Sequence, residues 1–229
     1  GSGASSTTTS SIVNNNLRIG ATVDAEASVS PNAGATADGA DEDGVTLPAN
    51  LTPGATYTIP VSVFNNTGAF ANLNAWIDFD NDGSFNSTVA ATNGAGSGEK
   101  LSAEINVPAN ASAQTVNITF TVPSGASLGA ARGVRFRFTS ISASSAPTGA
   151  VGSGEVEDYV VTLSDSDFGD GIGGLRAFAT VNANLKLGAQ IDAEAYPVTS
   201  PDSLTDDTTN LDDEDGVSMG TLVSNGVFR

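Results

Sequence analysis

The stretch ATYTIPVSVFNN, residues 55–66, alternates apolar and polar side chains as a β-strand with one buried face does. Tyr57, Ile59, Val61 and Val63 fall on one side, and threonine, proline and serine fall on the other. Successive side chains of a strand point to opposite faces, so this alternation predicts a half-buried strand.

Further stretches share this short, strand-forming character and are separated by Pro, Gly, Ser or Asn. They are NLNAWIDF (72–79), EKLSAEINV (99–107), QTVNITFTV (114–122), RGVRFRFTSI (132–141) and EVEDYVVTL (155–163). No apolar pattern with the 3.6-residue period of a helix accompanies them. We therefore predict an all-β protein built as an antiparallel, Ig-like β-sandwich.

Two acidic phrases occur twice, in the same order, near the two ends of the chain. They are VDAEA (23–27) before DEDGV (41–45), and IDAEA (191–195) before DEDGV (213–217). The first phrase belongs to a longer match between NNNLRIGATVDAEA (14–27) and NANLKLGAQIDAEA (182–195). Self-similarity with a period of about 170 residues indicates a tandem repeat of whole domains.

The repeat divides the chain into four expected parts. Residues 1–11 are a tag-like, flexible linker, 12–163 one sandwich repeat, 164–180 a Gly/Asp-rich connector, and 181–229 the truncated opening of the next repeat. Part of a sandwich leaves its apolar face uncovered. We therefore expect residues 181–229 to pack on the first sandwich or on a neighbouring chain.

The composition excludes several classes of function. The chain has no histidine and no cysteine, and its 26 acidic and 8 basic residues give a formal net charge of −18. Ser-His-Asp and Cys-His catalysis, zinc sites and disulfides are therefore not expected. Nucleic-acid binding is not expected, because phosphate contacts need clustered Lys and Arg. No apolar run is long enough to cross a membrane.

The acidic cluster with the most specific pattern is DFDNDGSF, residues 78–85. Asp78, Asp80 and Asp82 have the spacing of the first half of an EF-hand loop, where alternate carboxylates converge on Ca²⁺ and a glycine permits the turn. The twelfth position is Val89 rather than a bidentate glutamate, and Glu99 could close the site from a longer loop. A metal-free Asx hairpin is the alternative.

The repeated phrases form a second candidate metal site. Its residues are Asp24, Glu26, Asp41 and Asp43, with Glu157 and Asp158 as partner ligands, and Asp192, Glu194, Asp213 and Asp215 in the second copy. A solvated acidic turn would explain either phrase alone, whereas repetition in the same order favours a site. Ca²⁺ is expected rather than Mg²⁺, which takes fewer protein ligands. Paired carboxylates also serve glycosidases, but Trp76, the only tryptophan, falls in a strand and indicates no sugar cleft.

The phrase GEVEDY at 154–159 adds a family resemblance. With WIDFDNDGSF (76–85), GVRFRFTS (133–140), DFGD (167–170) and VDAE before DEDGV, the chain resembles the GEVED domain of bacterial surface proteins. DFGD continues here as GIGG, where family members often have proline and DSY. The resemblance implies a β-sandwich module of a large, calcium-dependent adhesin at the cell surface, and no catalytic residue.

Three functions remain open from the sequence. One is a structural module that extends a surface adhesin and is stiffened by Ca²⁺ between neighbouring repeats. Another is a module whose loops bind a glycan or a surface protein. The third is self-association, in which the truncated segment pairs with the sheet edge of another chain.

Overall fold

A computed structural model of the chain describes residues 14–23, 42–85, 99–140, 146–149, 153–164, 166–169, 177–182 and 184–191. The chain divides into two compact units, Gly1–Leu163 and Ser164–Arg229. The described residues contain strands and turns and no helix, so the predicted all-β class is confirmed. No helix that could span a membrane occurs in this part of the chain.

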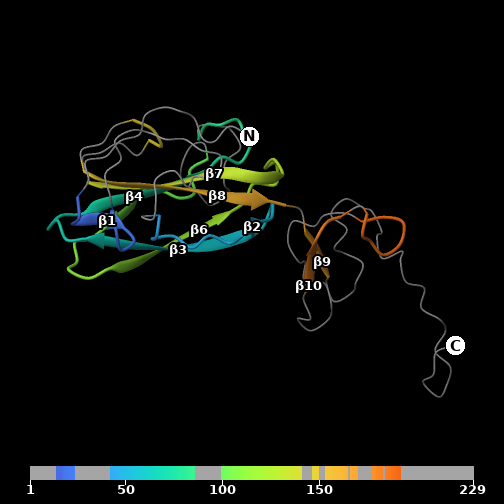
Figure 1. The fold of residues 1–229 in the computed structure, drawn as a ribbon, viewed down its shortest axis with the longest axis horizontal. Helices are drawn as coiled ribbons and strands as arrows, with labels where there is room; N and C mark the ends of the chain where they lie inside the picture. The colour runs from blue at the N-terminus through green and yellow to red at the C-terminus, as the bar shows by residue number, and fades with distance from the viewer. Residues whose placement is uncertain are drawn as a thin grey trace, which may run out of the picture. The chain divides into compact units, whose positions relative to one another are not determined.

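The first unit contains two sheets, drawn as two layers in Figure 1. The three-stranded sheet has the order β1-β3-β6, with β1 at Leu17–Ile19, β3 at Thr56–Asn65 and β6 at Gln114–Thr121. The five-stranded sheet has the order β2-β8-β7-β4-β5. Its strands are β2 (Asn50–Leu51), β4 (Ala71–Ile77), β5 (Ile105–Val107), β7 (Gly129–Ser140) and β8 (Gly154–Leu163).

One hydrophobic core lies between the two sheets. In β3, Ile59, Val61 and Val63 are buried, while Thr58 and Pro60 are exposed, as the alternation predicts. Side chains from both sheets form a single buried cluster that includes Ile118, Phe120, Leu73, Ile77, Phe136, Phe138 and Val161. This shared core supports the β-sandwich, because each sheet covers the apolar face of the other.

Trp76 is buried, as a strand position predicts, but it faces away from that core. Its neighbours Ala75 and Ile77 belong to the cluster, so the side chain of Trp76 points to the outer face of the five-stranded sheet. There the Nζ of Lys100 lies 5.8 Å from the centroid of the indole ring. Trp76 is 2% exposed and therefore offers no exposed platform for a sugar.

The strands differ from the sequence prediction in three places. β2 pairs in parallel with β8, so the sandwich is not wholly antiparallel. The strand expected at 99–107 is limited to Ile105–Val107, although Lys100 forms an isolated bridge with Trp76. In the second unit, the predicted connector 164–180 contains an antiparallel hairpin of β9 (Ser166–Gly169) and β10 (Ala177–Thr180). Strands of two to four residues escape prediction because alternation is a weak signal over so short a length.

Gly154 marks the position where β8 must begin. Its φ is +143°, a backbone conformation that residues with a side chain rarely adopt. A Cβ at this position would lie 2.0 Å from the carbonyl oxygen of Phe138, on the paired strand β7. Because that obstacle is backbone, it cannot move without disturbing the ladder between β7 and β8.

We expect Gly154→Ala to lower the free energy of unfolding by more than about 2 kcal/mol, from backbone strain together with the clash. Gly125→Ala is the matched control, since a Cβ at Gly125 would have no atom within 4 Å. The control should change stability by less than about 0.5 kcal/mol. Urea unfolding followed by tryptophan fluorescence measures both; equal effects would contradict the packing described here.

Candidate metal site at the end of β4

Three aspartates converge directly after β4. One carboxylate oxygen from each of Asp78, Asp80 and Asp82 lies within 4.8 Å of the others. Asp78 is buried, Asp80 is half-buried and Asp82 is exposed, so the cluster reaches from the edge of the core to the surface. The structure thus brings together the three residues that the sequence selected as the first half of an ion-binding loop.

Two left-handed residues curl this loop around its carboxylates. Asn81 has φ +62° and Gly83 has φ +82°, both in the region that permits tight turns. The N–H groups of Asp82 and Gly83 donate to Asp78 at 3.2 and 3.0 Å, and the N–H of Asp82 also donates to Asp80 at 3.1 Å. These are the Asx-turn bonds of the metal-free alternative, but each carboxylate oxygen keeps a further lone pair for a cation.

Glu99 enters the site from the segment that returns beside β4. The N–H of Ile77 donates to the carbonyl of Glu99 at 3.1 Å, which aligns the two segments. The Oε1 of Glu99 accepts hydrogen bonds from the N–H groups of Phe79 at 2.5 Å and Asp80 at 3.2 Å. The side chain is fully buried, and its Oε2 has no hydrogen-bond partner.

The electrostatics of Glu99 and Asp78 are unfavourable without a cation. Burial, together with the charges of Asp78 and Asp80, raises the pKa of Glu99 to about 8 against the opposing effect of the two N–H donors. Burial likewise raises the pKa of Asp78, opposed by the N–H of Gly83. A buried carboxylate with an unpaired oxygen is costly, and a divalent cation would relieve that cost.

The DEDGV phrase of the first unit serves a structural role in the sandwich. Asp43 accepts hydrogen bonds from the N–H of Ala21 at 2.8 Å and from the hydroxyl of Thr22 at 3.2 Å. The N–H groups of Asp43 and Gly44 each donate to the Oε1 of Glu157 at 3.2 Å. The structure thus places Asp43 and Glu157 together, as the sequence suggested, but joins them through backbone N–H groups.

The segment after β1 and the DEDGV phrase meet at Ser62 on β3. The N–H of Gly20 donates to the carbonyl of Ser62 at 2.8 Å, and the N–H of Ser62 donates to the carbonyl of Gly44 at 2.9 Å. A Cβ at Gly20 would lie 1.6 Å from the Oδ1 of Asp43, and one at Gly44 would lie 2.4 Å from the nitrogen of Gly20. Both glycines are therefore required, because the two backbones cross in contact.

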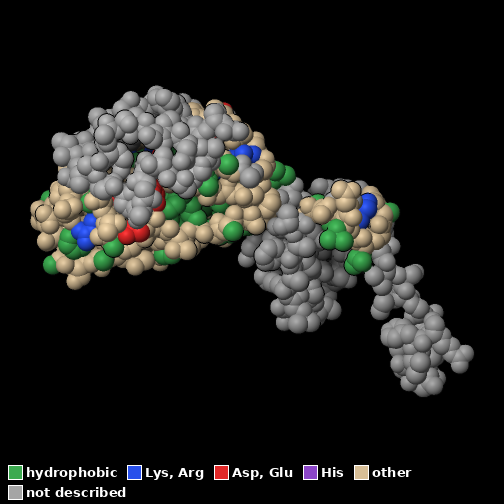
Figure 2. Space-filling model, in the orientation of Figure 1, with side chains coloured by type: hydrophobic (Ala, Val, Ile, Leu, Met, Phe, Trp, Pro, Cys, Tyr) green, Lys and Arg blue, Asp and Glu red, His purple; other side chains and the backbone are tan. Residues whose placement is uncertain are grey.

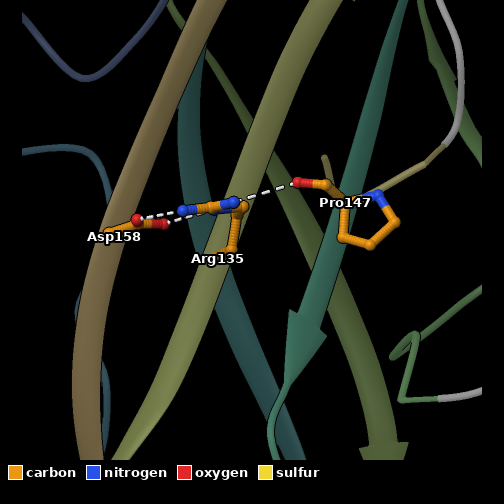
Figure 3. A network of polar contacts seen from close by, with 3 residues as sticks. All are labelled: Arg135, Pro147 and Asp158. Carbon is orange, nitrogen blue, oxygen red and sulfur yellow. Dashed lines mark hydrogen bonds and ion pairs between the residues drawn. The ribbon is translucent and has the colours of Figure 1, made fainter. Parts of the chain in front are cut away.

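Asp158 lies on the outer face of the five-stranded sheet. Its two carboxylate oxygens accept hydrogen bonds from Arg135, at 2.7 Å from Nε and 2.5 Å from Nη2 (Figure 3). Arg135 also donates to the carbonyl of Pro147 at 3.0 Å. Figure 3 shows Arg135 between the two residues, so it ties β8 to the segment 146–149. In this geometry the charge of Asp158 is balanced by an arginine.

The remaining predicted site residues lie outside the described residues. They are Asp24, Glu26, Asp41, Asp192, Glu194, Asp213 and Asp215.

Glu155 is a buried carboxylate that sequence reasoning did not select. It accepts a hydrogen bond from the N–H of Ile19 in β1, a strand of the opposite sheet. The available signal was the alternation in β8, which places Glu155 and Glu157 on the same face as Val161 and Leu163. Two acidic residues on the face of a strand that also carries buried apolar side chains indicate carboxylates inside the fold.

Comparison with known proteins supports the family resemblance. Residues 72–162 match the GEVED domain, which confirms that resemblance over these residues. No curated protein matches the chain. Among solved structures, the ASH/PapD-like domain of human CEP192 (PapD-like domain 7) is similar at 13% identity and a TM-score of 0.25. The alignment covers 62% of this chain and 92% of that one.

The burial of Glu157 predicts a pH dependence of stability. Burial raises its pKa to about 7 from an ordinary 4.5, against hydrogen bonds from Tyr159, Gly44 and Asp43. The folded protein then holds this proton more tightly than the unfolded chain, so the contribution of Glu157 to stability is fully present below pH 4.5 and is lost as the pH rises through 7. In chelator, Glu157→Gln should flatten this fall by an amount on the order of 3 kcal/mol.

Urea titrations between pH 4 and pH 8 measure that slope. Glu104→Gln, at an exposed position, removes the same charge and should leave the slope unchanged. An identical slope in the parent chain and in Glu157→Gln would contradict a raised pKa at Glu157.

Proposed function

From the GEVED match as its premise, we propose that this chain is a calcium-binding structural module of a large bacterial surface adhesin. In this proposal the module is extracellular, its partners are neighbouring repeats, and it has no enzymatic activity. The absence of histidine and cysteine from the sequence supports the non-enzymatic part, and the repeated phrases support the tandem arrangement.

The unpaired Oε2 of Glu99 is the observation that carries the proposal. Three aspartate carboxylates alone are common on protein surfaces without a metal ion. Glu99 is different, because its side chain is buried beside two of these aspartates and half of its carboxylate lacks a donor. A fully buried carboxylate in that state indicates a ligand that arrives from solution.

The donor set favours Ca²⁺ over other cations. All four side chains, Asp78, Asp80, Asp82 and Glu99, offer carboxylate oxygens, the ligands that hard divalent cations prefer. Ca²⁺ takes six to eight oxygen ligands in a flexible arrangement, whereas Mg²⁺ keeps most of its water. A loop that supplies carboxylates at alternate positions and a fourth from a separate segment fits the larger ion.

Binding at this position would stiffen the sandwich. The aspartate loop continues from β4, and Glu99 belongs to the segment that runs beside β4, so one ion would join both segments. The N–H of Ser127 donates to the carbonyl of Phe79 at 2.7 Å, which connects the loop to the segment before β7. Ca²⁺ would therefore fix one end of the five-stranded sheet, a useful property in a module that projects from a cell.

Calcium is expected to stabilise the parent chain. An ion at 100 times its dissociation constant adds about 2.7 kcal/mol, which raises the Tm of a domain of this size by roughly 5–10 °C. Asp80→Asn and Glu99→Gln should lose most of this gain, because each removes a carboxylate ligand. Both should keep a Tm in chelator close to that of the parent chain.

Calorimetric titration with Ca²⁺ and thermal unfolding, with and without chelator, measure these effects. Glu104→Gln is the matched control, since it removes an exposed carboxylate outside the cluster and should retain the full gain. A parent Tm that chelator does not change would remove the metal from the proposal. A gain preserved in Asp80→Asn and Glu99→Gln would place the ion elsewhere.

A further inference from the structure

Residues 182 and 184–191 in the second unit have the local structure of the corresponding residues around β1. The N–H of Leu17 donates to the carbonyl of Asn14 at 2.7 Å, and the N–H of Leu185 donates to that of Asn182 at 2.8 Å. Each asparagine also accepts from the N–H two residues later, at 3.0 Å in both copies.

The end of the segment is also repeated. The side chain of Arg18 donates to the carbonyl of Ala21, and that of Lys186 donates to the carbonyl of Ala189. The glycines agree as well, with φ +69° at Gly20 and +77° at Gly188. The turn on each side of the second copy is therefore formed in the geometry that flanks β1 in the first.

The two copies differ in what covers their apolar side chains. Leu17 and Ile19 are 1% and 0% exposed in the sandwich, whereas Leu185 and Leu187 are 78% and 75% exposed. Figure 2 shows hydrophobic side chains at the surface of the described part of the second unit. Within the described residues, Leu185–Leu187 has no strand partner. An exposed pair of leucines whose counterparts in the first copy are buried indicates a surface that docks elsewhere.

The first unit shows the binding site that such a segment requires. β1 pairs with β3 through Leu17 and Asn65, Arg18 and Phe64, and Ile19 and Val63. The guanidinium of Arg18 lies 4.2 Å from the centroid of the Phe64 ring. Lys186, at the equivalent position, can make the same cation–π contact.

The position after β1 requires a glycine. There the backbone of Gly20 passes against Asp43 and Gly44 with no room for a side chain. Gly188 meets that requirement. The N–H of Leu187 corresponds to the N–H of Ile19, which donates a hydrogen bond to Glu155.

We propose that residues 184–191 are a preformed copy of β1 that docks along β3 of a second copy of this chain. Leu185 and Leu187 enter the positions of Leu17 and Ile19. Gly188 takes the position of Gly20, where the backbone packs against Asp43 of the second copy. The partner is a sandwich of the same design, because the complementary features, from the register of β3 to Glu155, are those that seat β1.

Each sandwich already holds its own β1, so docking requires strand exchange. The β1 of the same chain has an effective concentration of roughly millimolar. At micromolar protein concentrations it therefore outcompetes residues 184–191 of another chain for β3. Exchange therefore increases when β1 is weakened and when the protein is concentrated.

Disulfide trapping tests the proposal in the full chain, which contains no cysteine. Lys186→Cys with Phe64→Cys places thiols at positions that would face each other, as Arg18 and Phe64 do. In an Ile19→Ala background, oxidation should give a disulfide-linked species of twice the chain mass. Its yield should be several-fold above that with an intact β1 and should rise with protein concentration.

Three comparisons control the trapping. Arg18→Cys with Phe64→Cys should close within one chain and reports that the geometry supports a disulfide. Lys186→Cys with Thr58→Cys measures collisional cross-linking, since Thr58 pairs with Thr119 rather than with β1. Gly188→Val in the Ile19→Ala background should abolish the specific species, because a side chain there cannot pass Asp43.

Absence of the 186–64 disulfide above the collisional level, with the 18–64 control formed, would overturn the proposal. A 186–64 disulfide within one chain would overturn the assignment of the partner as a second copy. If Ile19→Ala does not fold, Ile19→Val, which removes a single methyl group, provides the background for the same measurement.

Discussion

The hydrogen bonds that Glu155 and Glu157 accept inside the sandwich are the interaction on which its N-terminal segment depends. Glu155 binds the N–H of Ile19, and Glu157 binds those of Asp43 and Gly44 together with the hydroxyl of Tyr159. β8 belongs to the five-stranded sheet, whereas Ile19 lies in the three-stranded sheet. Two carboxylates on one strand thus hold segments that run along β3 of the other sheet.

Burial is costly for both carboxylates, and backbone donors offset that cost. Backbone N–H groups at the edge of a sheet suit this role, because they need a hydrogen-bond acceptor in any case. The same arrangement explains why glycine stands at positions 20 and 44, where the two segments cross without room for a Cβ. The carboxylates of β8 and the glycines at positions 20 and 44 are therefore parts of one contact region.

The carboxylates at the end of β4 are not balanced by backbone donors alone. Glu99 receives two backbone donors at one oxygen and none at the other, and its neighbours Asp78 and Asp80 are acidic. Asp158, in contrast, is balanced by Arg135. Acidic residues that look alike in the sequence therefore divide into groups held by N–H donors, by an arginine and, as we propose, by Ca²⁺.

The sequence by itself determined the all-β class, the main strands and the acidic loop, because alternation and D-x-D-x-D-G spacing are local patterns. It also indicated that Glu99 could join that loop. Only the tertiary structure decided which carboxylates meet N–H groups, since Glu157 and Asp43 are far apart in the chain and become neighbours through sheet packing. It likewise separated Asp158 from Glu157, because adjacent residues of a strand point to opposite faces and so meet different partners.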